Sequence, residues 1–97
     1  METTNDELTD LRLLLDIADQ KLLTALSERL QLVERIGILK AEKGIPPLDE
    51  ARWQVVLQTR TEKGAALGLS PEFVTAIFNT IHTEALRIEA RIASVEI

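Results

Sequence analysis

Two permanent cations stand on an otherwise apolar stripe of the sequence. If residues 11–40 are read as a helix, at about 100° per residue, Arg29 and Lys40 fall on one face, eleven residues apart. The same arc, about 80° wide, carries seven apolar residues: Leu11, Leu15, Ala18, Leu22, Leu26, Val33 and Ile36. An unpaired cation in such a stripe is costly, so we expect either carboxylates on other helices or an anionic ligand that enters the seam. Basic side chains beside a helix seam can also extend to solvent, and this stretch alone leaves these interpretations open.

Three further charged residues favour an anionic ligand. Arg12 lies at the flank of the stripe, about 100° from its centre, where it could reach over a second copy of the chain. Arg52 follows Asp49 at the expected start of a helix, an end that is itself positive. Glu89 falls at the edge of the apolar face of a later helix. Four cations with few obvious buried carboxylates indicate a pocket for a small dianion.

The composition limits which other chemistry is available. The chain has 97 residues, no cysteine and one histidine, which excludes disulfides, thiolate catalysis and Cys-rich zinc sites. With one histidine, a metal site would have to consist mostly of carboxylates. A formal net charge of −5 argues against a nucleic-acid partner. The N-terminus lacks the pattern of a secretory signal and no apolar run approaches the ~20 residues that span a bilayer, so no membrane association and a cytoplasmic location are the default.

The positions of these residues follow from the expected helices. Aromatic residues make up only 3% of the chain and helix-forming residues dominate, which predicts an all-α fold in one domain, 1–97. A long helix capped by Asn5 or Asp6 should run to about residue 42, with Gly37 as a weak point where another segment can approach the backbone. A short helix should begin at Asp49 and fade at residues 64–68. A medium helix should follow Ser70, with Pro71 as its first residue, and end near residue 94. Its apolar face is expected to comprise Val74, Ile77, Phe78, Ile81, Ala85, Ile88 and Ile92.

The length of the first helix bears on the oligomeric state. About 37 residues at 1.5 Å each give a rod of about 55 Å, whereas a compact chain of this size has a radius of gyration of about 13 Å. The two shorter helices cannot cover the whole apolar stripe. We therefore predict that three helices, long, short and medium, form an intertwined homodimeric bundle.

At this point the sequence resembles a known family, the all-helical (AroQ-type) chorismate mutases. The likeness extends over residues 8–92, and its motifs are specific as a set. They are L-R near the start, E-R seventeen residues on, I-G-x-x-K, a G-x-P-x-x-D-x-x-R loop and helix start, and I-F-x-x-I-H-x-E in the third helix. The resemblance implies an intertwined homodimer with two equivalent sites.

Residue roles are implied by the same resemblance. Arg12 matches the arginine that one subunit contributes to its partner's site, and Arg29 the arginine that pairs a substrate carboxylate. Lys40 matches the lysine that bridges a carboxylate and the ether oxygen of the substrate. Arg52 corresponds to a further cation in the site, and Asp49 to a position near the ring hydroxyl.

Three positions depart from the family pattern. Trp53 stands where many members have a glutamate that holds the ring hydroxyl, and it is expected either to pack with Val56 and Leu57 or to line the pocket. Ala85 replaces a serine that often touches a carboxylate. Glu89 stands where many relatives have glutamine as hydrogen-bond donor to the ether oxygen, so it must carry a proton to donate that bond. A second interpretation of Glu89 is a surface glutamate that pairs with a neighbouring arginine.

The implied reaction is the rearrangement of chorismate to prephenate in aromatic amino-acid biosynthesis. It needs no nucleophile, so the resemblance implies that the protein uses neither a metal nor a cofactor. The catalytic groups would be Lys40, Glu89 and Arg29, acting by confinement and by electrostatic stabilisation. Three further hypotheses are a mutase acting on 4-amino-4-deoxychorismate, a lyase that eliminates pyruvate from isochorismate, and a non-catalytic helical dimerisation module. His82, at the border of the third helix's apolar face, is expected to pack or to form a hydrogen bond between helices, and not to act as an acid or base. Glu84, Arg87 and Arg91 are expected to face solvent.

Overall fold

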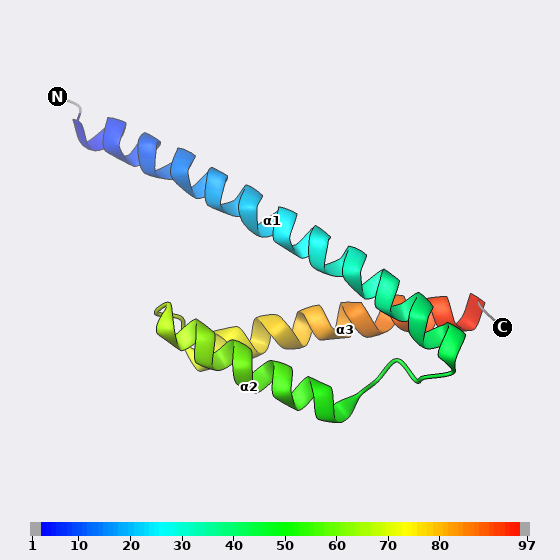
Figure 1. Ribbon diagram of the computed structural model, residues 1–97. Helices are drawn as coiled ribbons and strands as arrows, with labels where there is room; N and C mark the ends of the chain where they lie inside the picture. The colour runs from blue at the N-terminus through cyan, green and yellow to red at the C-terminus, as the bar shows by residue number, and fades with distance from the viewer. Residues whose placement is uncertain (1–2, 96–97) are drawn as a thin grey trace. The chain divides into compact units, whose positions relative to one another are not determined.

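The computed structural model describes residues 3–95, all of whose regular structure is helical. The helices are α1 (Thr3–Lys43), α2 (Glu50–Ala66) and α3 (Pro71–Val95) (Figure 1). The long, short and medium order and the all-α class are therefore confirmed. The predicted single domain, 1–97, includes residues 1–2 and 96–97, which lie outside the described residues, and it stays a prediction.

The ends of the helices follow local chemistry that is visible in the sequence. The Asp49 side chain accepts a hydrogen bond from the backbone N–H of Arg52 at 3.0 Å and so caps α2, as predicted. Ser70 Oγ accepts from the backbone N–H of Phe73 at 3.1 Å, and Pro71 is the first residue of α3. The cap predicted at Asn5 or Asp6 is wrong, because α1 begins at Thr3. Asp6 instead lies in the first turn, where a negative charge is favourable.

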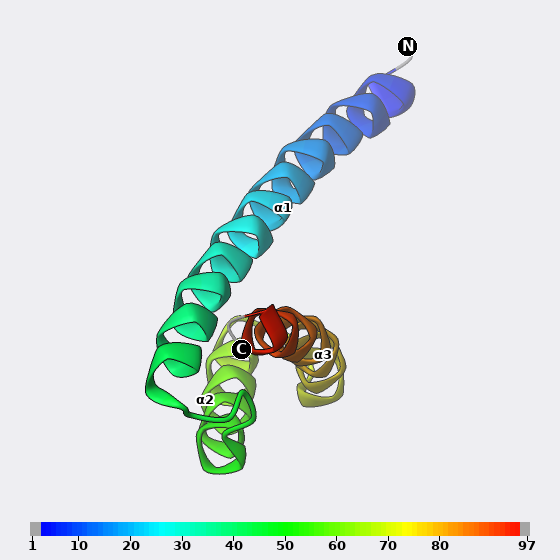
Figure 2. The same cartoon turned by 90° about the vertical axis from the view of Figure 1, so that its right-hand side faces the viewer.

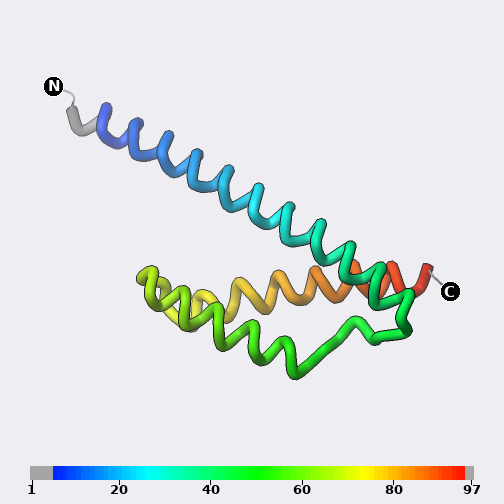
Figure 3. Tube along the Cα trace, in the orientation of Figure 1, coloured from blue at the N-terminus to red at the C-terminus, as the bar shows by residue number. Residues whose placement is uncertain are grey.

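Glycines in the left-handed conformation terminate α1 and α2. Gly44 has φ +68°, and the N–H groups of Ile45 and Gly44 bond back to the carbonyls of Lys40 and Ala41 at 2.8 and 3.3 Å. Gly68, with φ +85°, ends α2 with the same pair of bonds to Gly64 and Ala65. As Figure 3 shows, the chain then crosses from α1 to α2 in an extended connection and from α2 to α3 in a tight turn.

The chain divides into two compact units, Met1–Leu32 and Val33–Ile97, and α1 runs through the boundary between them. In the first unit every described side chain from Asp6 to Ala25 is exposed. Leucines of the predicted stripe are among them, with exposed fractions of 56% for Leu11, 60% for Leu15 and 58% for Leu22. The expectation that this part of α1 carries uncovered apolar surface is confirmed for the single chain.

The second unit contains the core. The helices α2 and α3 lie side by side and antiparallel, as the two perpendicular views in Figures 1 and 2 show. The buried apolar side chains are Val33, Trp53, Val56, Val74, Ala85 and Ile88. Of the predicted apolar face of α3, Val74, Ala85 and Ile88 are buried, Phe78, Ile81 and Ile92 are half-buried, and Ile77 is exposed. This packing fixes the face of α3 that meets the end of α1.

Candidate functional site

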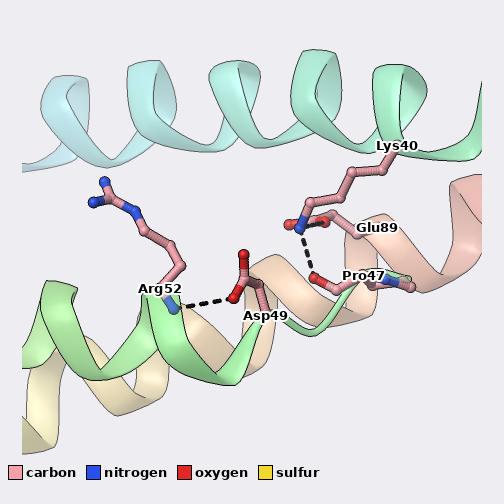
Figure 4. Close-up of polar contacts among 5 residues, drawn as sticks. All are labelled: Lys40, Pro47, Asp49, Arg52 and Glu89. Atoms are coloured by element: carbon pink, nitrogen blue, oxygen red, sulfur yellow. Dashed lines mark hydrogen bonds and ion pairs between the residues drawn. The ribbon is translucent and has the colours of Figure 1, made fainter. Parts of the chain in front are cut away.

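Lys40 is held in place by contacts from two other segments of the second unit. Its ammonium group donates a hydrogen bond of 2.6 Å to the carbonyl of Pro47, in the connection after α1. It also forms an ion pair with Glu89 of α3, with 2.9 Å between Lys40 Nζ and Glu89 Oε1 (Figure 4). The Lys40 side chain is 21% exposed. The cation is therefore fixed, and only partly screened by water.

Glu89 is the one charged residue that is buried among the described residues, at 7% exposure. Its Oε1 atom is close enough to Lys40 for an ion pair but lacks the angles of a hydrogen bond to any described group. A buried carboxylate needs a counter-charge, and Lys40 supplies it. The interpretation of Glu89 as a surface glutamate paired with an arginine is wrong, because the helix packing turns this side chain inward toward Lys40.

The first turn of α2 contributes two further charged residues. Asp49 and Arg52 are both exposed, and Figure 4 shows their side chains extending from the start of this helix. The hydrogen bond from the Arg52 N–H to Asp49 Oδ1 uses one carboxylate oxygen of the cap and leaves the Arg52 guanidinium outside that contact. A cation at this helix end is not needed for capping, so its charge is available to a ligand.

Trp53 packs in the core and stacks on His82. The two rings are nearly parallel, with 6° between their planes and 3.7 Å between their centroids. Trp53 is only 8% exposed and shares the buried face of α2 with Val56, while Leu57 is half-buried. This arrangement supports packing as the role of both rings. The stack itself was not predicted, because nothing in the spacing of the two residues indicates which face of α3 meets α2.

The remaining predicted residues belong to the first unit or to the core of the second. Arg12, which is exposed, and Arg29, which is half-buried, belong to the unit Met1–Leu32. Ala85 is buried one turn before Glu89, where its small side chain is part of the core. The convergence of Arg12, Arg29 and Arg52 with Lys40 on one cavity therefore stays a prediction.

Sequence reasoning missed the contribution of the connection between α1 and α2. The carbonyl of Pro47, in this connection, accepts a hydrogen bond of 2.6 Å from the Lys40 ammonium group. A backbone carbonyl has no sequence signature. The only available hint was the proline itself, whose restricted φ fixes the direction of the chain there.

The described residues indicate neither a metal site nor a membrane span. Within residues 3–95, no three His, Asp or Glu side chains gather closely enough to hold a metal ion. None of the helices described combines the length and apolar character that a bilayer crossing needs. The site presents an ammonium group fixed beside a buried carboxylate, which is suited to hold an anion or to stabilise negative charge on an oxygen.

Comparison with known proteins places the chain in a family. The family model described as chorismate mutase type II matches residues 11–90. The 4-amino-4-deoxychorismate mutase of Streptomyces venezuelae is 32% identical over 94 residues, which cover 97% of this chain and 91% of that protein. The protein of the same name from Streptomyces pristinaespiralis is 36% identical over 84 residues, covering 87% of this chain and 65% of that protein.

A third relative is much longer. The T-protein of Enterobacter agglomerans is 32% identical over 83 residues, covering 86% of this chain but only 22% of its own length. The match therefore covers most of this chain but less than a quarter of the T-protein. Since the family model spans most of this chain, and one relative is matched over nearly its full length, the protein belongs to the chorismate mutase type II family.

Proposed function

We propose that this protein converts chorismate to prephenate, as an isomerase of aromatic amino-acid biosynthesis. The observation that carries the proposal is the Lys40 ammonium group, fixed by Pro47 and by the buried Glu89 in a chain of this family. The reaction breaks a C–O bond and forms a C–C bond within one molecule, so it needs no nucleophile. What the protein must supply is a reactive conformer and positive charge at the ether oxygen.

Lys40 and Glu89 act together at that oxygen. In the free protein each neutralises the other. A substrate carboxylate that enters the site competes for the ammonium group, after which Lys40 bridges this carboxylate and the ether oxygen. In its protonated form Glu89 would donate a hydrogen bond to the same oxygen, so that no carboxylate charge opposes the charge developing there.

The other predicted residues hold the dianion. Arg29 pairs one substrate carboxylate, and Arg12 of a second copy pairs the other, since a guanidinium group suits bidentate binding of carboxylates. Arg52 adds positive charge, and Asp49 lies near the ring hydroxyl. The homodimer that this requires is supported by the exposed leucines of α1, which present an apolar surface to a partner.

A second candidate substrate is 4-amino-4-deoxychorismate. Two of the relatives carry that name, and Trp53, stacked on His82, occupies the position where many family members have the glutamate for the ring hydroxyl. A site without that glutamate lacks one contact that would distinguish a hydroxyl from an amino group on the ring. Elimination of pyruvate from isochorismate is a third candidate reaction, and a purely structural role is the fourth candidate.

The decisive experiment incubates the purified protein separately with chorismate, 4-amino-4-deoxychorismate and isochorismate. Loss of the enol-ether absorbance is followed, and the product is identified by chromatography. We expect chorismate to give the highest kcat/KM and prephenate to be the product. Preference for the amino compound would replace the first proposal with the second, and pyruvate from isochorismate would identify a lyase. No turnover of any compound would leave only the structural role.

A pair of lysine variants tests the mechanism. Removal of one preorganised donor commonly lowers kcat by about 10²- to 10³-fold, so we expect Lys40→Ala to lose activity by this amount while remaining folded. Lys43→Ala is the matched control, because Lys43 is an exposed lysine in the same final turn of α1. A folded Lys40→Ala protein with wild-type turnover would contradict the mechanism.

A further inference from the structure

Gly37 lies on the same face of α1 as Lys40, one turn earlier, and it is buried against α3. A Cβ atom added there would lie 3.1 Å from Ile92 Cδ1, 3.3 Å from Glu89 Cγ and 3.4 Å from Glu89 Cα. Two of the three nearest atoms thus belong to Glu89. Glycine is unfavourable inside a helix, so its presence at this contact calls for a local reason.

The three contacts differ in how easily they can yield. Ile92 Cδ1 is the end of a flexible side chain and can move by a change of rotamer. Glu89 Cα, in the backbone of α3, lies at an ordinary van der Waals distance and need not move. Glu89 Cγ is closer, and it is part of the side chain whose carboxylate meets Lys40 at 2.9 Å. A methyl group at position 37 therefore displaces the Glu89 side chain at Cγ by a few tenths of an ångström, whatever Ile92 does.

We propose that Gly37 is a positioning residue, which sets the approach of α3 to α1 and thereby the position of the Glu89 carboxylate against the Lys40 ammonium group. This rests on the function proposed above and adds a residue to it. Gly37 touches no reacting atom. Its contribution is the absence of a side chain at the one place where Glu89 must come close to α1.

The test is the Gly37→Ala variant of the full chain. Because alanine favours helix over glycine, we expect the variant to keep its helix content. Small displacements of catalytic groups are costly, so kcat should fall about tenfold, while KM changes little because the arginines that hold the substrate carboxylates are untouched. An unchanged kcat would overturn the proposal, and so would a variant in which only KM changes.

Two double variants separate positioning from packing. Gly37→Ala with Ile92→Val removes Cδ1, the nearest clashing atom, yet we expect the loss of kcat to persist because the Glu89 contacts remain. Full recovery would mean that Gly37 matters only for packing on Ile92. In a Glu89→Ala background, Gly37→Ala should cause no further loss of kcat, since its effect acts through the missing side chain. Additive losses would contradict the proposal.

A readout independent of turnover keeps this proposal separate from the function. The ammonium resonance of Lys40, assigned in a ¹⁵N-lysine spectrum by its loss in Lys40→Ala, should shift in Glu89→Gln and shift in the same direction in Gly37→Ala. If the wild type turns over none of the compounds, the proposed function fails while this shift still reports on positioning. If the shift is absent in Gly37→Ala, the positioning role fails whatever the substrate.

Discussion

At the scale of single residues, the uncommon feature is a carboxylate where the proposed mechanism needs a hydrogen-bond donor. Glu89 is buried and paired with Lys40. The sequence alone indicated both residues, because each interrupts an apolar face. It also predicted that another segment can approach the backbone at Gly37, and the contact with α3 confirms this. It could not indicate that this segment brings Glu89 there, or that Pro47 shares the ammonium group, since a backbone carbonyl leaves no pattern.

The hydrogen-bond donor proposed at position 89 can be tested by substitution. Glu89→Gln supplies an amide donor in place of the carboxyl group, so we expect it to retain kcat, whereas Glu89→Ala can donate no such bond and should lower kcat by about 10²-fold. Glu84→Ala is the control, the same truncation on α3 at a side chain that is 43% exposed, and it should retain the wild-type kcat. Equal kcat values for the wild type and Glu89→Ala would remove Glu89 from the mechanism.

At the scale of secondary structure, the starts of α2 and α3 could be predicted from capping side chains and proline, and both were correct. The start of α1 was predicted wrongly, because the helix begins before the polar residues that were expected to cap it. The solvent-facing residues of α3 were also predicted correctly. There Arg87 donates to both carboxylate oxygens of Glu84, at 3.0 and 2.6 Å.

This pair makes a small, pH-dependent contribution to the stability of α3. The hydrogen bonds from Arg87 hold the pKa of Glu84 below its ordinary value, and the charges of Arg87 and Arg91 act in the same direction against desolvation. Because the pKa of Glu84 is lower in the folded state, the pair stabilises that state at pH values above the ordinary pKa. This stabilisation is lost as the pH falls through the folded-state pKa. We expect Arg87→Ala to lower Tm slightly at neutral pH, because the pair is exposed, and to match the wild type in acid. In thermal melts, a Glu84→Gln background should abolish this difference; its persistence there would assign it to another group.

At the scale of the whole molecule, the sequence predicts an assembly from the length and exposed leucines of α1, but not its geometry. The side chains that would contact a second copy are the same ones that a single chain leaves exposed. Nothing in one chain fixes how two such surfaces align. The placement of Arg12 in a partner's site consequently depends on the family resemblance and needs its own test.

Mixing two inactive variants supplies that test. If Arg12 acts across a two-fold interface, a heterodimer of Arg12→Ala and Lys40→Ala subunits has one intact site and one doubly defective site. Equal amounts, exchanged to equilibrium, should recover about a quarter of the wild-type rate. If Arg12 acts within its own subunit, every site carries one defect and the mixture stays inactive. Each variant alone, treated in the same way, is the control.

Because of its hydrogen bond to Pro47, the Lys40 side chain has two separate roles. The group that would meet the substrate also anchors the irregular stretch of backbone that leads into α2. We therefore expect an anion that draws the ammonium group toward itself to weaken this hydrogen bond and to make the segment less ordered. For the same reason we expect an arginine at position 40, though equally charged, not to reproduce the hydrogen bond that holds this segment.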